Sequence, residues 1–145
     1  MLDLENFADY MLLHFFGDAE DWPHHNGHAM RNRGAGEPFK FYVWDQEIVL
    51  DNFRVARYSS RDSGRPGGLF QELRDSKEFR LVFADRVQKH LFNGGALSVK
   101  PSQDRYMALA NQIDKAIVAE SARWGKQSAG RRPAAAAARW GQNLW

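Results

Sequence analysis

The sequence predicts an α+β domain that is mainly helical and carries one small antiparallel hairpin. Apolar residues recur at helical spacing near the amino terminus and again through most of the second half of the chain. Between these regions, residues 39–44 form an aromatic and β-branched run that is typical of a strand. Glycines at 34 and 36 precede the run and indicate a turn. At 145 residues the chain has the length of one domain with one core.

The first predicted element is an amphipathic helix over residues 4–16. Its apolar face holds Leu4, Phe7, Met11, His14 and Phe15. Asp3 is suited to cap its amino end, and Gly17 is suited to end it. Residues 18–29 are rich in Asp, Pro, His, Asn and Gly, so we expect a loop there.

The predicted hairpin pairs a short segment at 28–32 with the strand at 39–44. Alternation along that strand points Phe39, Phe41 and Val43 to one side, which we expect to face the core. A further apolar stretch at 48–50 fits either a strand or a short helix. Ser, Arg, Gly and Pro dominate residues 54–68, which predicts a long surface loop.

The second half predicts three helices and a tail. The helices cover residues 69–73, 76–92 and 101–125, and the last should turn Tyr106, Leu109, Ile113, Ala116 and Ile117 inward. We therefore expect one domain over residues 1–125. Residues 126–145 hold four Lys or Arg, no acidic residue and five consecutive alanines, which predicts a flexible, solvated tail.

Composition and charge exclude several classes of function. The formal net charge is only +2, which gives no strong field for a nucleic-acid partner. No cysteine is present, so disulfides are excluded. No apolar run approaches the roughly 18 residues of a membrane span. Acidic residues interrupt the apolar amino terminus, which is unlike a secretory signal. We expect a soluble chain with no membrane partner, and its compartment is not assigned.

The candidate catalytic and metal-binding residues are Asp21, Asn26 and Asp45. Asn26 follows Asp21 by five residues in the loop after the first helix, and Asp45 ends the predicted second strand. In phosphoryl transfer, one Asp accepts the proton of the attacking hydroxyl, while an Asn and a second Asp hold Mg²⁺. The spacing alone leaves a plainer interpretation open, in which Asp21 caps a turn and Asp45 caps the strand exit.

Four segments together resemble the spore-coat CotH-like family of atypical protein kinases. They read DWPHHN, FKFYVWD, FADRVQKHLFNGGAL and AIVAESARWG. The resemblance covers residues 3–125 and is strongest to bacterial secreted members that carry lamin-tail modules. It implies a fold like a kinase large lobe, a catalytic Asp21, and Asn26 and Asp45 as metal ligands. It also implies Mg²⁺ or Mn²⁺ with ATP, and a protein as the substrate.

The pattern of the family is not followed throughout. Gly27 and His28 stand where the lamin-tail relatives have large aromatic residues. We expect the chain to be the carboxyl-terminal portion of such a domain, with an upstream lobe as its missing partner. That lobe would supply the adenine pocket and a basic residue for the phosphates. By itself the chain should therefore be catalytically incomplete, although full-length relatives are often exported kinases.

Two other classes of function stay open at this point. One is a non-catalytic interaction or structural module that keeps only the shape of the lobe. The other, more remote, is a metal-binding protein that uses His24, His25 and His28, of which the first and last are four residues apart. Pro23 and Gly27 oppose the continuous helix that this spacing would need.

Deleting residues 126–145 is expected to leave the thermal midpoint of unfolding almost unchanged. The tail offers little apolar surface beyond Trp140 and Trp145, so its removal should uncover little of the core. Differential scanning calorimetry of the full and shortened chains measures this. A fall of several degrees would show that the tail packs on the domain.

Overall fold

The computed structural model describes residues 1–34, 36–50 and 65–128, with side chains up to Trp124. These residues form two units, Met1–Pro101 and the described part of Ser102–Trp145. The elements are α1 (Leu4–Gly17), β1 (His28–Met30), β2 (Lys40–Tyr42), α2 (Pro66–Leu73), α3 (Lys77–Leu91) and α4 (Val99–Ser128). The predicted α+β class is confirmed, because helices dominate and the described sheet is one antiparallel pair.

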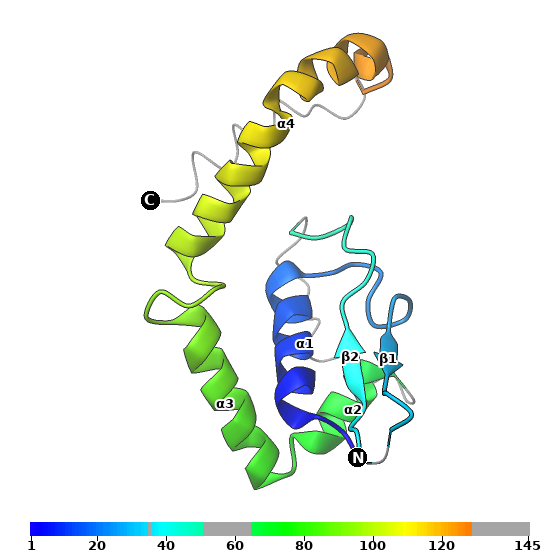
Figure 1. Cartoon of the computed structure of the whole chain (residues 1–145), viewed down its shortest axis with the longest axis vertical. Helices are drawn as coiled ribbons and strands as arrows, with labels where there is room; N and C mark the ends of the chain where they lie inside the picture. Colours follow the sequence, from blue (N-terminus) through cyan, green and yellow to red (C-terminus); the bar gives the residue numbers. More distant parts are fainter. Residues whose placement is uncertain (35, 51–64, 129–145) are drawn as a thin grey trace. The chain divides into compact units, whose positions relative to one another are not determined.

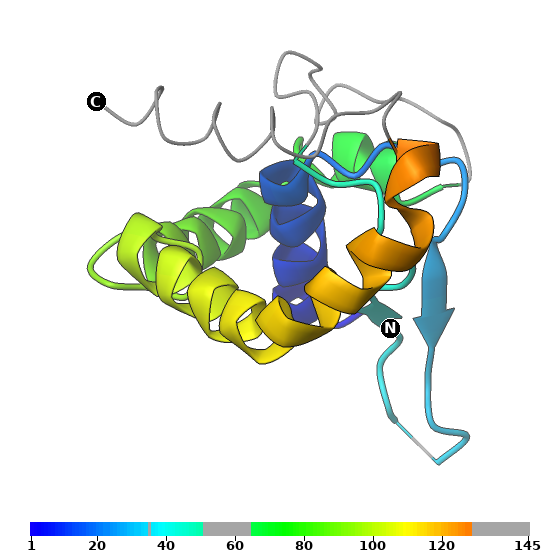
Figure 2. The ribbon, with the colours of Figure 1, turned by 90° about the horizontal axis from the view of Figure 1, so that it is seen from above.

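Helix α1 lies at the centre of the first unit, with the hairpin on one side and α3 on another (Figures 1 and 2). Asp3 caps it by accepting a hydrogen bond of 3.0 Å from the backbone N–H of Asn6. The helix ends at Asp18, which has a left-handed backbone (φ 49°) and donates its N–H to the His14 carbonyl. The sequence prediction for this helix is confirmed at both ends to within a residue.

The core of the first unit forms where α1 meets the loop after it, α2 and α3. Its buried apolar members are Phe7, Ala8, Tyr10, Met11, Leu12, Ala19, Trp22, Phe70 and Phe79. Most of them come from α1, which contacts α2, α3 and β2. Aromatic side chains fill much of the space, with Phe7 at 4.9 Å from Phe41 and Phe15 at 5.1 Å from Phe70 between ring centroids.

The hairpin is shorter than predicted and is attached to α1 by side-chain and backbone hydrogen bonds. Its register pairs His28 with Tyr42 and Met30 with Lys40. The Asn6 side chain accepts from the Phe41 N–H at 2.6 Å and donates to the Phe41 carbonyl at 3.2 Å. Asn6 therefore bonds β2 as a neighbouring strand would, which compensates for the small size of the sheet.

The expected inward face of the second strand is only partly correct. Phe41 is half-buried against α1, but Phe39 and Val43 are 40% and 38% exposed. Phe39 and Val43 lie outside the ladder, which holds only Lys40–Tyr42, and Phe39 instead pairs by its backbone with the segment before α1.

Helices α2 and α3 follow residues 51–64, which are not among the described residues and contain most of the predicted surface loop. Helix α2 begins earlier than predicted, with Pro66 in its first turn. The predicted helix at 76–92 is confirmed as α3, and Ser76 caps it through a 3.3 Å hydrogen bond from the Phe79 N–H. Phe79 is buried in the core, and Val82 and Phe83 pack at its edge.

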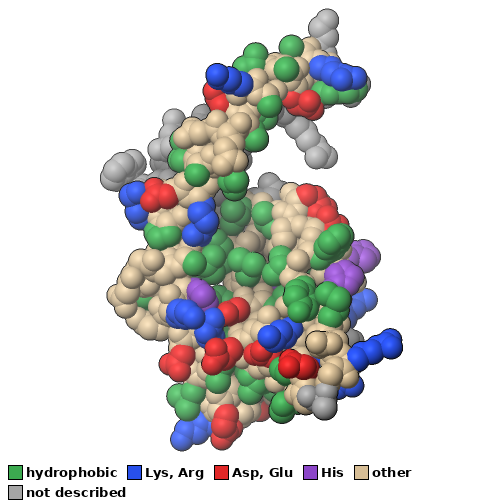
Figure 3. All heavy atoms as spheres, viewed as in Figure 1, with side chains coloured by type: hydrophobic (Ala, Val, Ile, Leu, Met, Phe, Trp, Pro, Cys, Tyr) green, Lys and Arg blue, Asp and Glu red, His purple; other side chains and the backbone are tan. Residues whose placement is uncertain are grey.

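A charged cluster joins α3 to α1. The Arg86 guanidinium donates to both carboxylate oxygens of Asp9, with the Nε contact at 2.6 Å, and to Glu5 at 3.1 Å. The His90 Nε2 lies 3.0 Å from Asp9. Hydrogen bonding to Asp9 raises the pKa of Arg86, so the guanidinium stays charged. Figure 3 shows acidic, basic and histidine side chains gathered over these helices.

From Ser102 onward, helix α4 forms the described part of the second unit. The predicted inward side chains are exposed instead, with Tyr106 at 72%, Leu109 at 62%, Ile113 at 53% and Ile117 at 49%. The helix itself was predicted correctly from its spacing. Spacing does not show what packs against the apolar side, and no other described element belongs to this unit. The predicted tail lies almost wholly beyond the described residues. No described helix is long and apolar enough to cross a membrane.

Replacing Arg86 by Lys is expected to lower the free energy of unfolding by about 1–2 kcal/mol. Lys keeps the charge but loses the planar fork that contacts Asp9 through two nitrogens. Urea denaturation measures the change. Arg80→Lys is the matched control, because the Arg80 guanidinium donates to the Arg74 and Asp75 carbonyls near the start of the same helix. Equal losses in the two variants would contradict a special role for the α1–α3 cluster.

Candidate functional site

A buried tryptophan holds the loop that carries the candidate catalytic residue. Trp22 is 1% exposed, and its indole N–H donates to the Tyr10 hydroxyl at 2.8 Å. Its ring stacks on the His14 imidazole at 4.7 Å between centroids and 9° between planes, and it meets Phe15 edge-on at 5.9 Å. Asp21 therefore sits half-buried beside an anchored residue, with its backbone position set by packing against α1.

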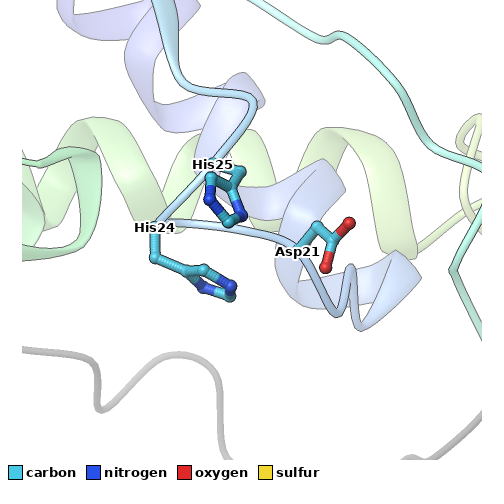
Figure 4. A group of neighbouring side chains, drawn as sticks. All are labelled: Asp21, His24 and His25. Carbon is cyan, nitrogen blue, oxygen red and sulfur yellow. The ribbon is translucent and has the colours of Figure 1, made fainter.

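The loop folds back on itself directly after this anchor. The His25 N–H donates to the Asp21 carbonyl at 2.9 Å, which closes a turn over Pro23. As a result one ligand atom each of Asp21, His24 and His25 lies within 4.8 Å of the other two. Figure 4 shows the three side chains as neighbours along the loop. Both histidines are exposed.

Asn26 and Asp45 lie on the two chain segments that meet at the open end of the hairpin. The ladder ends at His28 and Tyr42, and the His28 and Trp44 rings still contact each other beyond it, at 6.2 Å. Asn26 and Asp45 both have left-handed backbones, with φ of 56° and 53°. Asn and Asp tolerate this conformation better than most residues, which explains these residue types at the two exits.

The segment after Asp45 returns to the end of α1. The Ile48 carbonyl accepts from the Glu20 N–H at 3.1 Å, and the Leu50 N–H donates to the Gly17 carbonyl at 2.6 Å. Glu20 directly precedes Asp21 in the chain. Two backbone hydrogen bonds thus join the strand exit to the start of the Asp21 loop, and the hairpin joins the same exit to Asn26.

The structure brings one of the candidate residues, Asp21, together with two histidines. Among the described His, Asp and Glu side chains, Asp21 forms a three-membered group with His24 and His25, and Asp45 is not part of it. His28, the partner of His24 in the remote alternative, enters β1 and its ring contacts Trp44, and metal binding by the histidine cluster stays a prediction. The roles of Asp21 as catalytic residue and of Asn26 and Asp45 as metal ligands stay predictions.

A hollow of about 510 Å³ lies elsewhere in the first unit. It is lined by Leu12, Phe15, Phe70, Arg74, Phe79, Arg80, Phe83 and Ala84. None of the three candidate site residues lines it. The hollow is mainly apolar, whereas the candidate polar ligands lie on the Asp21 loop and at the hairpin exit.

The family model described as CotH kinase protein matches residues 1–144, so the chain belongs to the CotH kinase family. This confirms the resemblance drawn from the four sequence segments. Comparison with curated proteins and with solved structures gave no match. Lamin-tail association and a bacterial source stay predictions.

Sequence reasoning missed the residue that supports the Trp22 anchor. Tyr10 is buried and supplies the acceptor for the indole N–H. Its spacing of four from His14 places both rings on one face of α1, where their centroids are 4.5 Å apart. That spacing was the available signal. The expectation that His14 packs on the helix face is confirmed.

His14 is buried as a neutral aromatic ring. It is 0% exposed, and neither ring nitrogen has a hydrogen-bond partner within the described part of the chain. Burial lowers the pKa of His14 from 6.5 to about 4. Below pH 6.5 the unfolded chain therefore binds a proton that the folded chain excludes, so the folded state loses stability as the pH falls toward 4.

The variant His14→Phe is expected to flatten this acid dependence. Between pH 7 and pH 4 the original chain should lose roughly 3 kcal/mol more unfolding free energy than the variant, which keeps the stacked ring but cannot be protonated. Urea denaturation across this pH range measures both. His28→Phe, at an exposed position, is the matched control. Parallel curves for the original chain and His14→Phe would contradict the burial argument.

Proposed function

We propose that this domain serves phosphoryl transfer from a nucleotide to a protein hydroxyl, with Asp21 as the base and Asn26 and Asp45 as ligands of Mg²⁺ or Mn²⁺. The observation that carries the proposal is the joining of the Asp21 loop, the hairpin entry at Asn26 and the hairpin exit at Asp45 by backbone hydrogen bonds, in a member of the CotH kinase family.

The donor set of Asn26 and Asp45 fits a hard cation. One amide oxygen and one carboxylate are ligands that Mg²⁺ accepts, and it usually keeps several waters or phosphate oxygens as well. Asp45 is exposed and Asn26 is half-buried, which leaves room for those further ligands. When bound, the ion would neutralise charge on the phosphates of ATP.

The Asp21 carboxylate is suited to act as a base because the backbone beneath it is held in place. A general base must lie within hydrogen-bond reach of the hydroxyl whose proton it takes, so its backbone has to be fixed. The neighbouring Trp22 supplies that fixation through its bond to Tyr10 and its stacking on His14. The carboxylate itself is half-buried and stays accessible to a hydroxyl.

A second candidate function is a non-catalytic interaction module. The observation in its favour is the exposed apolar side of α4, including Tyr106, Ile113 and Ile117. Exposed apolar surface of this kind is common at protein–protein contacts. Divalent-cation binding distinguishes the two functions, because an interaction module has no need of a metal.

The variant Asp45→Ala is expected to weaken Mn²⁺ binding by at least about tenfold, which is ~1.4 kcal/mol, since one of two protein ligands is lost. Electron paramagnetic resonance of free Mn²⁺ measures the binding. Asp85→Ala, at an exposed position on α3, is the matched control. Unchanged binding in Asp45→Ala would contradict the assignment of this ligand.

Transfer of phosphate from Mg·ATP by the chain alone is expected to be negligible. Asp21, Asn26 and Asp45 supply neither an adenine pocket nor a cation for the phosphates, and kinases need both. A radiolabelled-phosphate assay measures it. Strong metal-dependent autophosphorylation, abolished by Asp21→Ala, would contradict this expectation while supporting the role of Asp21.

A further inference from the structure

Asp21, His24 and His25 form a second set of metal-ligand atoms, different in chemistry from Asn26 and Asp45. We propose that these three side chains bind a late first-row divalent metal, with Zn²⁺ as the natural choice. Two imidazole nitrogens and one carboxylate oxygen are ligands that Zn²⁺, Co²⁺ and Ni²⁺ favour, whereas Mg²⁺ prefers oxygen throughout.

The geometry needs only small side-chain movements to close on an ion. The three ligand atoms lie within 4.8 Å of one another. Around a Zn²⁺ ion, with bonds of about 2.0–2.2 Å, neighbouring ligand atoms lie roughly 3–3.5 Å apart. His24 and His25 are exposed, so their rings can turn to make up the difference without displacing core residues. The rings already lie 4.6 Å apart between centroids.

The backbone under these ligands is held in place without a metal. Trp22 fixes the start of the loop in the core, and the His25 N–H bond to the Asp21 carbonyl fixes the turn between the ligands. Binding therefore orders two side chains and does not have to fold a segment. Three protein ligands leave a fourth position of a tetrahedral ion for water.

The proposed ion has a consequence for the same carboxylate that the proposed function uses as a base. This consequence, unlike the binding itself, rests on the proposed function. A carboxylate bound to Zn²⁺ shares a lone pair with the metal, which makes it a much weaker acceptor for the proton of a hydroxyl. Micromolar Zn²⁺ should then inhibit any phosphoryl transfer that depends on Asp21, even with Mg²⁺ in excess.

Co²⁺ titration of the 145-residue chain, metal-free and without an affinity tag, tests the site. We expect visible absorption bands typical of four- or five-coordinate Co²⁺, saturating at one ion per chain, and their loss when Zn²⁺ is added. His24→Gln and His25→Gln should each weaken binding by at least about tenfold, since one of three protein ligands is lost. His28→Gln is the matched control, because His28 is exposed in the next element but outside the group.

Two results would overturn the site. One is the absence of saturable Co²⁺ or Zn²⁺ binding in the original chain, and the other is unchanged binding in the His24→Gln, His25→Gln double variant. Circular dichroism shows whether each variant keeps the fold. Asp45→Ala separates this inference from the proposed function, because it should reduce Mn²⁺ binding and leave Co²⁺ binding intact. If Asp45→Ala lost both Mn²⁺ binding and Co²⁺ binding, the proposal that the two metal sites are distinct would be contradicted.

Discussion

The candidate site depends on the packing of Trp22, which lies in the loop after α1, against that helix. Burying an indole of this size contributes at most about 5 kcal/mol, a large share of the stability of a small domain. The indole N–H would be costly to bury without an acceptor, and the Tyr10 hydroxyl supplies one at 2.8 Å. Polar residues on either side of the anchor can therefore stay at the surface while their backbone is fixed.

The hairpin depends on α1 in a different way. Two strands are marginal as an isolated sheet, so their position must come from elsewhere in the unit. Asn6 supplies two hydrogen bonds to Phe41, and the backbone of Met1 and Asp3 bonds that of Phe39 at 2.9 and 3.0 Å. Because Trp22 and Asn6 both act through α1, one helix sets the positions of the loop and of the hairpin.

Local signals predicted the helices well, because a helix end is determined by residues close in sequence. Asp3 was readable as a cap for this reason, and the helix beginning at Ser76 was placed to within a residue. The contacts that assemble the unit join distant residues and leave no local pattern. Asn6 and Phe41 are 35 residues apart, and Asp9 and Arg86 are 77 apart. The exposed face of α4 is another case, because its periodicity predicts a buried side but does not show which residues would cover it.

For the candidate site, too, the sequence predicted what depends on neighbouring residues and missed what depends on the folded structure. Motif and family resemblance identified Asp21, Asn26 and Asp45, but the grouping of Asp21 with His24 and His25 was not predicted. The histidines were compared with the spacing of ligands on a helix, which led to His24 and His28. A turn closed by the His25 N–H brings residues three and four apart together without a helix, and that bond is visible only in the structure.

Only a short stretch of chain connects the Trp22 anchor to the hairpin, and this explains why so many polar groups lie close together on the loop. Pro23 is buried beside the Trp22 anchor, and His28 is the first residue of the ladder, so only four residues connect them. A connection of this length cannot cross the surface freely, because each residue spans at most about 3.6 Å. His24, His25 and Asn26 are therefore held between Asp21 and the hairpin. Any chemistry at Asp21 takes place among these neighbours, whichever of them binds a metal.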